Sequence, residues 1–320
     1  MEKILFVDVI LKERIWGGDN LNKRYNQNEQ AKIGEAWIFS GHRNGQSKVI
    51  NGKYKGIELN ELYLENKAIF GNSNYDRFPL LIKIIDAKDD LSVQVHPNDD
   101  YALKHHNDLG KNECWYILDA KADAKIVYGH KAKSASEFKN YIDNNKIDEI
   151  LNYITVKNDE FYNIKSGTVH AIGSGIEILE VQQSSDTTYR LYDYNRVDSA
   201  GNKRELHIER ALDVIDYNND NNLADLTISN NAINYISNDY FSVTKTINNK
   251  LLEVSNNNQY IILYAHKENA IIKIDNKNYE LQKGYTALIP AYIERFELLA
   301  NGEVFIITEK ALSIKNIKEI

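Results

Sequence analysis

Four residues from three separate stretches of the chain have the types and spacing of a divalent-metal site. Gln94 and His96 lie two positions apart in a strand-like run, so on a β-strand their side chains point to the same face. Glu113 opens a second strand-like run, and His170 follows a glycine-containing turn that returns the chain toward the same pocket. Two imidazoles, one carboxylate and one amide oxygen suit Zn²⁺ or a similar borderline ion.

The order of these residues is similar to that of the cupin barrels. Such proteins carry a polar-x-His pair on one strand, a Glu on the next strand and a Gly-x-x-His turn further on. Here Gln94 stands in place of the usual first His, and Lys165 in place of the usual Pro, while Gly167 and His170 keep the spacing. A single His in a β-rich protein is more often structural than a ligand. The combination, rather than any one residue, therefore indicates the metal site.

The remaining histidines and the one cysteine show no comparable pattern. His105 and His106 lie in a polar stretch that we interpret as a surface loop. Cys114 follows Glu113 directly, so on a strand it points to the opposite face and is expected to be a buried core thiol rather than a ligand. The histidines without a usable partner spacing are His42, His130, His207 and His266.

A second group of polar residues near the metal set has the chemistry of an anion site. Its members are Lys83, Ser92, Lys111 and Arg190. Lys83 stands inside the apolar run PLLIKIID, where a buried amine needs a partner of opposite charge. Three cations and a hydroxyl beside a metal would bind a phosphate monoester through charge-assisted hydrogen bonds. The alternative is that each forms an ordinary salt bridge, for example Lys83 with Asp86.

Composition limits the class of protein. The 320 residues include 39 basic and 46 acidic ones, a net charge of -7 with no basic tract, which argues against nucleic acid as a partner. No stretch reaches the roughly 18 apolar residues of a membrane span. One Cys excludes an internal disulfide framework and is typical of a reducing cytoplasm, where we expect the protein. The oligomeric state is left open.

Short β-branched and aromatic runs bounded by turn residues dominate the chain. They predict a mainly β fold of two cupin-like β-barrel or jelly-roll domains with a few short helices. The expected divisions are a catalytic metal-binding domain at 1–215, an Asn-rich crossing segment at 216–238 and a C-terminal domain without metal at 239–320. A weak repeat between 162–183 and 279–300 supports two related domains. Helices are expected around 57–70, after Ser134 and around 208–215.

Longer strings closely resemble the type I mannose-6-phosphate isomerases in their short bacterial form. The resemblance covers most of residues 5–215 and continues more weakly to the end. The strings that carry it are WGGDNL, GEAWIFSGH, PLLIKIIDAKDDLSVQVHPNDDYA, GKNECWYIL and GTVHAIGSGIEILEVQQSSDTTYRLYDYNRVD.

The resemblance implies a zinc enzyme, with one ion per chain, that interconverts mannose 6-phosphate and fructose 6-phosphate through a cis-enediol. Its small-molecule partner is thus a sugar phosphate. By motif, the metal ligands fall on Gln94, His96, Glu113 and His170. The implied active-site arginine is Arg190, the implied pocket carboxylate is Glu180, and the implied phosphate- and substrate-binding residues are Lys83, Ser92 and Lys111. We expect Arg190, Glu180 and Lys111 to be the catalytic residues. Glu180, a water on the metal and Lys111 are all candidates for the base.

Two other classes of protein share part of this pattern. A cupin with two His and one Glu can hold Fe²⁺ and use O₂, although the phosphate-type cluster and the Gln ligand argue against that chemistry. A non-catalytic metal-binding cupin that binds a sugar or sugar phosphate would use the metal only for structure. Such a structural site is closed and lacks convergent cations.

Overall fold

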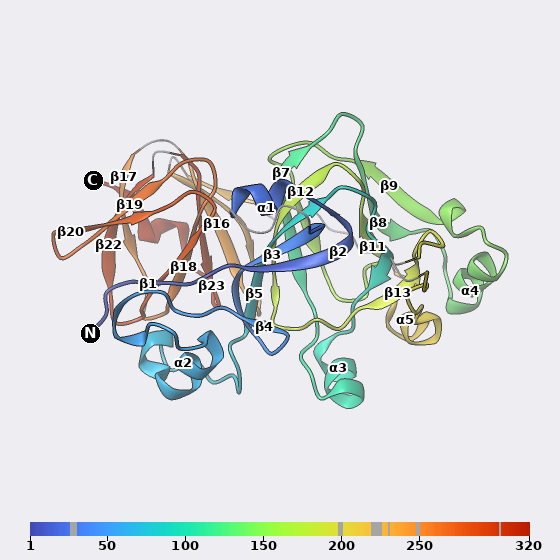
Figure 1. The fold of residues 1–320 in the computed structure, drawn as a ribbon, viewed down its shortest axis with the longest axis horizontal. Helices are drawn as coiled ribbons and strands as arrows, with labels where there is room; N and C mark the ends of the chain where they lie inside the picture. Colours follow the sequence, from blue (N-terminus) through green and yellow to red (C-terminus); the bar gives the residue numbers. More distant parts are fainter. Residues whose placement is uncertain (26–30, 198–200, 219–225, 230, 248–249, 301) are drawn as a thin grey trace. The chain divides into compact units, whose positions relative to one another are not determined.

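The computed structural model describes residues 1–320 except 26–30, 198–200, 219–225, 230, 248–249 and 301. The described chain is mostly β-strand with a few short helices, which confirms the predicted fold class (Figure 1). Its contacts divide it into two compact units. Unit 1 comprises Met1–Ile10, Trp37–Ile82 and Ala224–Ile320, and unit 2 comprises Leu11–Ala36 and Lys83–Leu223. The domain limits given by the sequence stay a prediction.

Unit 1 contains two antiparallel sheets that enclose one apolar core. The first sheet has the order β1 (Leu5–Phe6), β21 (Thr286–Ile289), β18 (Ile261–Ala265), β23 (Val304–Thr308), β16 (Ser242–Thr246), β15 (Ala232–Ser237) and β14 (Thr227–Ile228). The second has the order β20 (Lys277–Leu281), β19 (Ala270–Ile274), β22 (Arg295–Ala300), β17 (Leu251–Ser255) and β24 (Ile317–Glu319). Strands β14 and β15 both lie within residues 216–238, which the sequence analysis interpreted as a crossing segment.

Unit 2 also contains two sheets. The first has the order β10 (Phe161–Ile164), β7 (Glu113–Ala120), β12 (Ile176–Gln183), β5 (Leu80–Ala87), β3 (Ile33–His42) and β2 (Ile10–Gly18), with β4 (Gly45–Gln46) beside β3. Of these, β3 from Trp37, β4, and β5 up to Ile82 count with unit 1. The second sheet has the order β13 (Tyr189–Tyr192), β6 (Val93–Val95), β11 (His170–Ile172), β8 (Lys125–His130) and β9 (Leu151–Thr155). The sheets are jelly-roll-like rather than closed barrels.

Alternation along the strands separates two apolar clusters in unit 2. Val93 and Val95 on β6 pack in a cluster with residues of helices α4 (Ala135–Asp143) and α5 (Ile208–Val214). Trp115 on β7 and Ile172 on β11 belong to a second cluster shared by the two sheets. Because successive side chains of a strand point to opposite faces, Gln94 points away from the helices and toward the other sheet.

Five short α-helices accompany the strands in the described part of the chain. They are α1 (Asn20–Arg24), α2 (Leu59–Glu65), α3 (Asp99–His106), α4 (Ala135–Asp143) and α5 (Ile208–Val214). The 3₁₀ turns are η1 (Gly52–Tyr54), η2 (Lys67–Phe70), η3 (Ile147–Glu149) and η4 (Ile314–Asn316). Helices α2, α4 and α5 lie where the sequence predicted them, and α4 begins with the predicted cap, the Ser134 hydroxyl accepting from the Glu137 amide. None of the described helices combines the length and apolar composition needed to cross a membrane.

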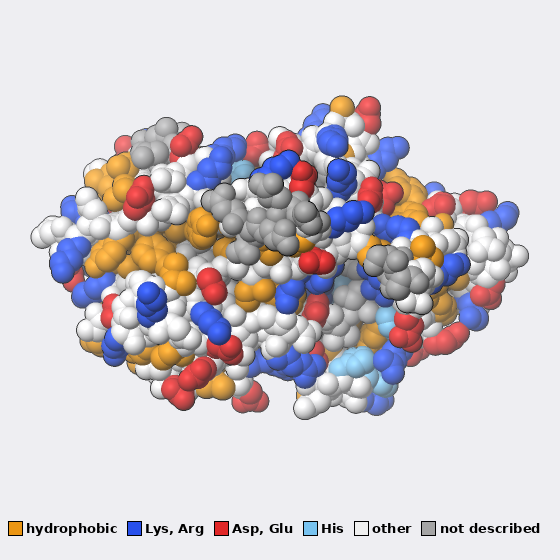
Figure 2. All heavy atoms as spheres, viewed as in Figure 1, with side chains coloured by type: hydrophobic (Ala, Val, Ile, Leu, Met, Phe, Trp, Pro, Cys, Tyr) orange, Lys and Arg blue, Asp and Glu red, His pale blue; other side chains and the backbone are white. Residues whose placement is uncertain are grey.

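The interpretation of His105 and His106 as loop residues is wrong, because both end helix α3. The side chain of Asn98 caps this helix by accepting from the Tyr101 amide, and acidic residues fill its first turn. His105 is nevertheless exposed. Figure 2 shows histidine atoms at the surface over α3.

Candidate active site

Three of the four predicted metal ligands form one buried cluster in unit 2. The Nε2 atoms of His96 and His170 lie 3.1 Å apart, and each lies 3.5 Å from a carboxylate oxygen of Glu113. Two ligands of a tetrahedral zinc ion with bonds of about 2.1 Å lie roughly 3.4 Å apart, so these spacings suit ligands of a single ion. The fourth predicted ligand, Gln94, places its Nε2 3.3 Å from His170 Nε2.

Backbone carbonyls fix the protonation of the two imidazoles. The Nδ1–H of His96 donates to the Thr187 carbonyl at 3.0 Å, and that of His170 donates to the Thr168 carbonyl at 2.8 Å. Both Nε2 lone pairs are thereby turned toward each other. Burial, followed by repulsion from Lys111, holds the pKa of His96 well below its usual value, and burial lowers the pKa of His170 to about 4. Both rings are therefore neutral at pH 7, the form that ligates metal.

The surroundings of Glu113 test whether the cluster suits a cation. Trp115 Nε1–H donates to Glu113 Oε1 at 3.1 Å, whereas the buried Oε2 has no well-aligned hydrogen bond from a described residue and only an ion-pair contact. The Lys111 ammonium lies 3.1 Å from that oxygen and 3.0 Å from His96 Nε2. A buried carboxylate and two facing lone pairs need positive charge at their centre. The residues therefore fit a divalent cation. Gln94 fits as well, because rotation of its amide would replace Nε2 by the ligating oxygen.

Strand register explains how distant residues reach this cluster. Across the second sheet of unit 2, Gln94 on β6 lies directly opposite His170 on β11 and Arg190 on β13. The turns on either side of β11 each require a glycine. Gly167 has a φ of +86°, and a Cβ on Gly173 would lie 2.1 Å from the Lys125 carbonyl oxygen.

Lys83 and Glu180 form a buried ion pair that joins β5 to β12. Lys83 Nζ lies 2.8 Å from Glu180 Oε1, and both side chains are 4% exposed. Burial alone would lower the pKa of Lys83, but the carboxylates of Glu180, Glu35 and Asp186 raise it overall, so the ammonium is retained. Burial, followed by repulsion from Glu113, raises the pKa of Glu180. The salt bridge that the sequence offered, Lys83 with Asp86, is replaced by this pair.

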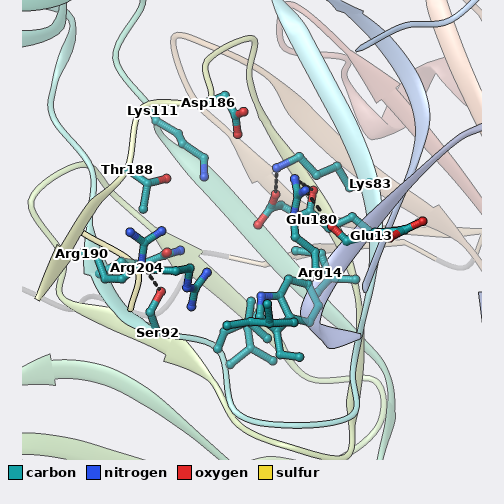
Figure 3. Close-up of a pocket in the computed structure, with 17 residues that line it drawn as sticks. Glu13, Arg14, Lys83, Ser92, Lys111, Glu180, Asp186, Thr188, Arg190 and Arg204 are labelled. Atoms are coloured by element: carbon teal, nitrogen blue, oxygen red, sulfur yellow. Dashed lines mark hydrogen bonds and ion pairs between the residues drawn. The ribbon is translucent and has the colours of Figure 1, made fainter. Parts of the chain in front are cut away.

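A pocket of about 430 Å³ in unit 2 adjoins the metal cluster, because Gln94 and Lys111 line it. The structure brings all the other predicted catalytic and substrate-binding residues to its wall: Lys83, Ser92, Glu180 and Arg190. Figure 3 shows Arg190 on one side of the pocket, with Lys83 and Glu180 on the other. A pocket of this volume suits a small-molecule ligand.

Arg190 differs from the other cations of the pocket in its partners. Its Nε donates to the Ser92 hydroxyl at 3.3 Å and its NH1 donates to the Glu205 carbonyl at 2.8 Å. Among the described residues, no carboxylate lies within ion-pair distance of this guanidinium. Burial, followed by repulsion from Arg204, lowers the pKa of Arg190, although an arginine side chain remains charged. Arg190 thus lines the pocket with a positive charge that has no carboxylate in direct contact among the described residues.

Sequence reasoning missed several charged residues of the pocket. Arg14 forms a bidentate ion pair with Glu35, with N–O distances of 2.8 and 3.0 Å. Arg204 pairs with Asp193 at 2.5 Å, and Asp186 also lines the pocket. Arg14 stands in a strand-like run with Lys12 and Glu13, so only the fold reveals which side chain faces inward. Asp186 lies four residues before Arg190, and its closeness in sequence to this predicted site residue could have indicated that it lines the same pocket.

A buried amide network holds the segment that carries Lys111 and Glu113. The Oε1 of Gln183 accepts from both the backbone and side-chain nitrogens of Asn112, at 2.9 and 2.8 Å. Asn112 Oδ1 in turn accepts from the Ser166 amide in the turn before His170. The network therefore links the start of β7, which presents Glu113, to the turn that leads to His170 on β11. Cys114 is buried on this segment, as expected from the sequence.

Two facing sheets with an inward cluster of His, Glu and His that could hold a metal ion define a protein of the cupin class. Family models match residues 4–156 as the type I phosphomannose isomerase catalytic domain and residues 231–309 as the mannose-6-phosphate isomerase cupin domain. A mannose-6-phosphate isomerase from Streptococcus mutans is 41% identical over 308 residues, which cover 95% of this chain and 98% of the relative.

Solved structures agree with this relation. The crystal structure of the mannose 6-phosphate isomerase from Bacillus subtilis matches with a TM-score of 0.91 at 36% identity, covering 96% of this chain and 99% of that one. A zinc-bound mannose 6-phosphate isomerase matches with a TM-score of 0.77 at 15% identity, covering 97% and 100%, a likeness of fold. The chain belongs to the type I mannose-6-phosphate isomerase family. It is an aldose–ketose isomerase whose substrate is a sugar phosphate.

Proposed function

We propose that the protein interconverts mannose 6-phosphate and fructose 6-phosphate through a cis-enediol, with one zinc ion per chain. The observation that carries this proposal is the arrangement of the pocket. A cluster fit for a divalent cation adjoins a pocket lined by Arg190, whose guanidinium has no described carboxylate within ion-pair distance. A structural zinc site would be closed and would not open onto such a pocket.

Gln94, His96, Glu113 and His170 would hold the zinc ion. With one carboxylate among four ligands, the site keeps a charge of about +1, so the ion supplies Lewis acidity toward the sugar carbonyl and hydroxyl. The zinc in a distant relative's structure supports this choice of metal. The Lys111 ammonium shares acceptors with the cation, so metal binding would turn this ammonium toward the pocket that it already lines.

Glu180 is the base that we propose for the carbon-bound proton. It lines the pocket, and burial raises its pKa toward the range in which a carboxylate removes and returns a proton efficiently. In the aldose-to-ketose direction it would take the proton from C2 and return it to C1. Lys111 would pass the hydroxyl proton between the two oxygens. Arg190 would stabilise the negative charge that develops on the enediol oxygens.

Lys83, Ser92 and Lys111 are the residues that we propose for substrate and phosphate binding. Ser92 hydrogen-bonds Arg190, and Lys83 is paired with Glu180, so both also order catalytic groups. Binding energy at the phosphate would orient the reacting end of the sugar. We further propose a cytoplasmic location, which agrees with the single buried thiol.

Chelation of the purified protein is expected to abolish isomerase activity, because the ion supplies Lewis acidity that no described residue replaces. A coupled assay on mannose 6-phosphate, with metal content measured on the same sample, tests this. Stoichiometric zinc should restore turnover. Full activity in metal-free protein would contradict the proposal, and oxygen uptake by the iron-loaded protein would favour a dioxygen-using cupin instead.

A further inference from the structure

We propose that His207 is a positioning residue that fixes Arg190 in its working orientation by completing the exposed edge of strand β13. The inference rests on the catalytic role proposed for Arg190. It adds the residue that holds Arg190 in the position this role requires. His207 had no partner spacing in the sequence and belongs to none of the groups described so far.

The argument begins with the position of β13 in its sheet. The strand lies at the end of the order β13-β6-β11-β8-β9, so within the described part of the chain one side of its backbone has no neighbouring strand. Arg190 pairs with Gln94 of β6 on the inner side. On the open side its amide and carbonyl need other partners, since each backbone N–H and C=O of a folded chain requires a hydrogen bond.

His207 provides both partners. Its backbone N–H donates to the Arg190 carbonyl at 2.8 Å, and its Nδ1 accepts from the Arg190 N–H at 3.2 Å. His207 thus provides the two hydrogen bonds that a neighbouring strand would make to Arg190, one through its backbone N–H and one through its side chain. His207 is the N-cap residue of α5, the helix that packs on β13, so its place is fixed by the core on that side.

The protonation of His207 suits this role. Burial, followed by repulsion from Arg190, lowers the pKa of His207, so its ring is neutral near pH 7 and one nitrogen is free to accept. Nε2 then carries the proton and lies 3.8 Å from the Glu205 carboxylate. The other charged or titratable groups that act on this ring are Arg210 and His106.

The same short segment also holds the far end of the arginine. The Glu205 carbonyl accepts from Arg190 NH1, while Ser92 on the opposite side accepts from Nε. His207 anchors the backbone of Arg190, and Glu205 and Ser92 fix its guanidinium. Loss of the His207 acceptor would let β13 shift at Arg190 and move the guanidinium away from the developing charge. A displacement on the order of 1 Å at such a group lowers turnover by up to about 100-fold.

Two variants of similar size test the role of His207 Nδ1 as a hydrogen-bond acceptor. His207→Asn places Oδ1 where the imidazole has Nδ1, whereas His207→Leu fills similar space without an acceptor. We expect His207→Leu to lower kcat about 10- to 100-fold with little change in KM, and His207→Asn to stay within a few-fold of the parent enzyme. Equal kcat values for the two variants would overturn the inference. His105→Ala, at the exposed end of α3, is the control histidine, and zinc content is measured in every sample.

A double-mutant cycle separates this inference from the proposed function. If His207 acts through Arg190, His207→Leu should cost nothing further in an Arg190→Ala background. If Arg190→Ala alone is nearly fully active, the proposed role of Arg190 fails. If Arg190→Ala is slow but His207→Leu costs the same factor in both backgrounds, the positioning role fails while the proposed function stands.

Amide hydrogen exchange on the unmodified protein gives a test that does not depend on a variant folding. The hydrogen bond to His207 predicts that the Arg190 amide exchanges much more slowly than a free amide. Exchange at the rate of a free amide would overturn the inference.

Discussion

Replacement of Arg190 by alanine is expected to lower turnover about 10²- to 10³-fold while the metal stays bound. Its guanidinium is held by neutral acceptors only, the Ser92 hydroxyl and the Glu205 carbonyl, so its charge is available to the substrate. Removing it takes away stabilisation of the enediol charge but none of the metal ligands. The measurement is kcat in the coupled isomerase assay, together with the zinc content of the same protein.

Two further variants sharpen the interpretation of Arg190→Ala. Arg190→Lys keeps a charge but loses the forked geometry of the guanidinium, so we expect it to recover only part of the lost turnover. Arg295→Ala, at a highly exposed site in unit 1, is the matched arginine control and should behave as the parent enzyme. Near-normal turnover of Arg190→Ala with zinc bound would remove this residue from the chemistry.

The residues that the sequence placed correctly are those whose spacing maps directly onto a strand. Gln94 lies two residues before His96, and β6 presents its side chain toward the cluster as a period of two requires. Cys114, next to Glu113, is buried as its alternation predicted. Local pattern therefore suffices where one strand sets the geometry.

The residues that the sequence missed depend on pairing between distant strands. Arg14 and Glu35 are 21 positions apart, and nothing in either run indicates that they meet as a bidentate pair. The sequence analysis missed helix α3 for another reason. Asn98 and the acidic first turn are helix-start signals, but Ala102 is its only buried residue, so the apolar periodicity that identifies helices is absent.

Lys83 is the case in which the sequence indicated the problem but not its solution. An amine in an apolar strand predicted a buried partner, and the fold supplies Glu180, 97 residues away, rather than nearby Asp86. The choice of partner follows from the adjacency of β5 and β12 in the first sheet of unit 2. Burial of that charge pair makes it the part of the pocket whose disruption should cost most in stability.

Lys83→Met is accordingly expected to lower the free energy of unfolding by about 3–5 kcal/mol, because it leaves the Glu180 carboxylate buried with no paired ammonium. The loss should also depend on pH. Burial and then Glu113 already raise the pKa of Glu180 above its ordinary value of 4.5, and removal of Lys83 raises it further. A carboxyl group with a raised pKa in the folded state contributes stability below its ordinary pKa that is lost as the pH rises through the raised value.

Urea unfolding of Lys83→Met beside the parent protein should therefore show a larger deficit at about pH 8 than at about pH 5. The double variant Lys83→Met/Glu180→Gln tests the cause, since a neutral amide can still accept from Trp115 Nε1–H, which lies 3.3 Å from Glu180 Oε2. It should recover most of the stability at pH 8, yet remain inactive because the proposed base is gone. A deficit that is the same at both pH values, or that persists in the double variant, would show that lost packing around Lys83 matters more than the unpaired charge.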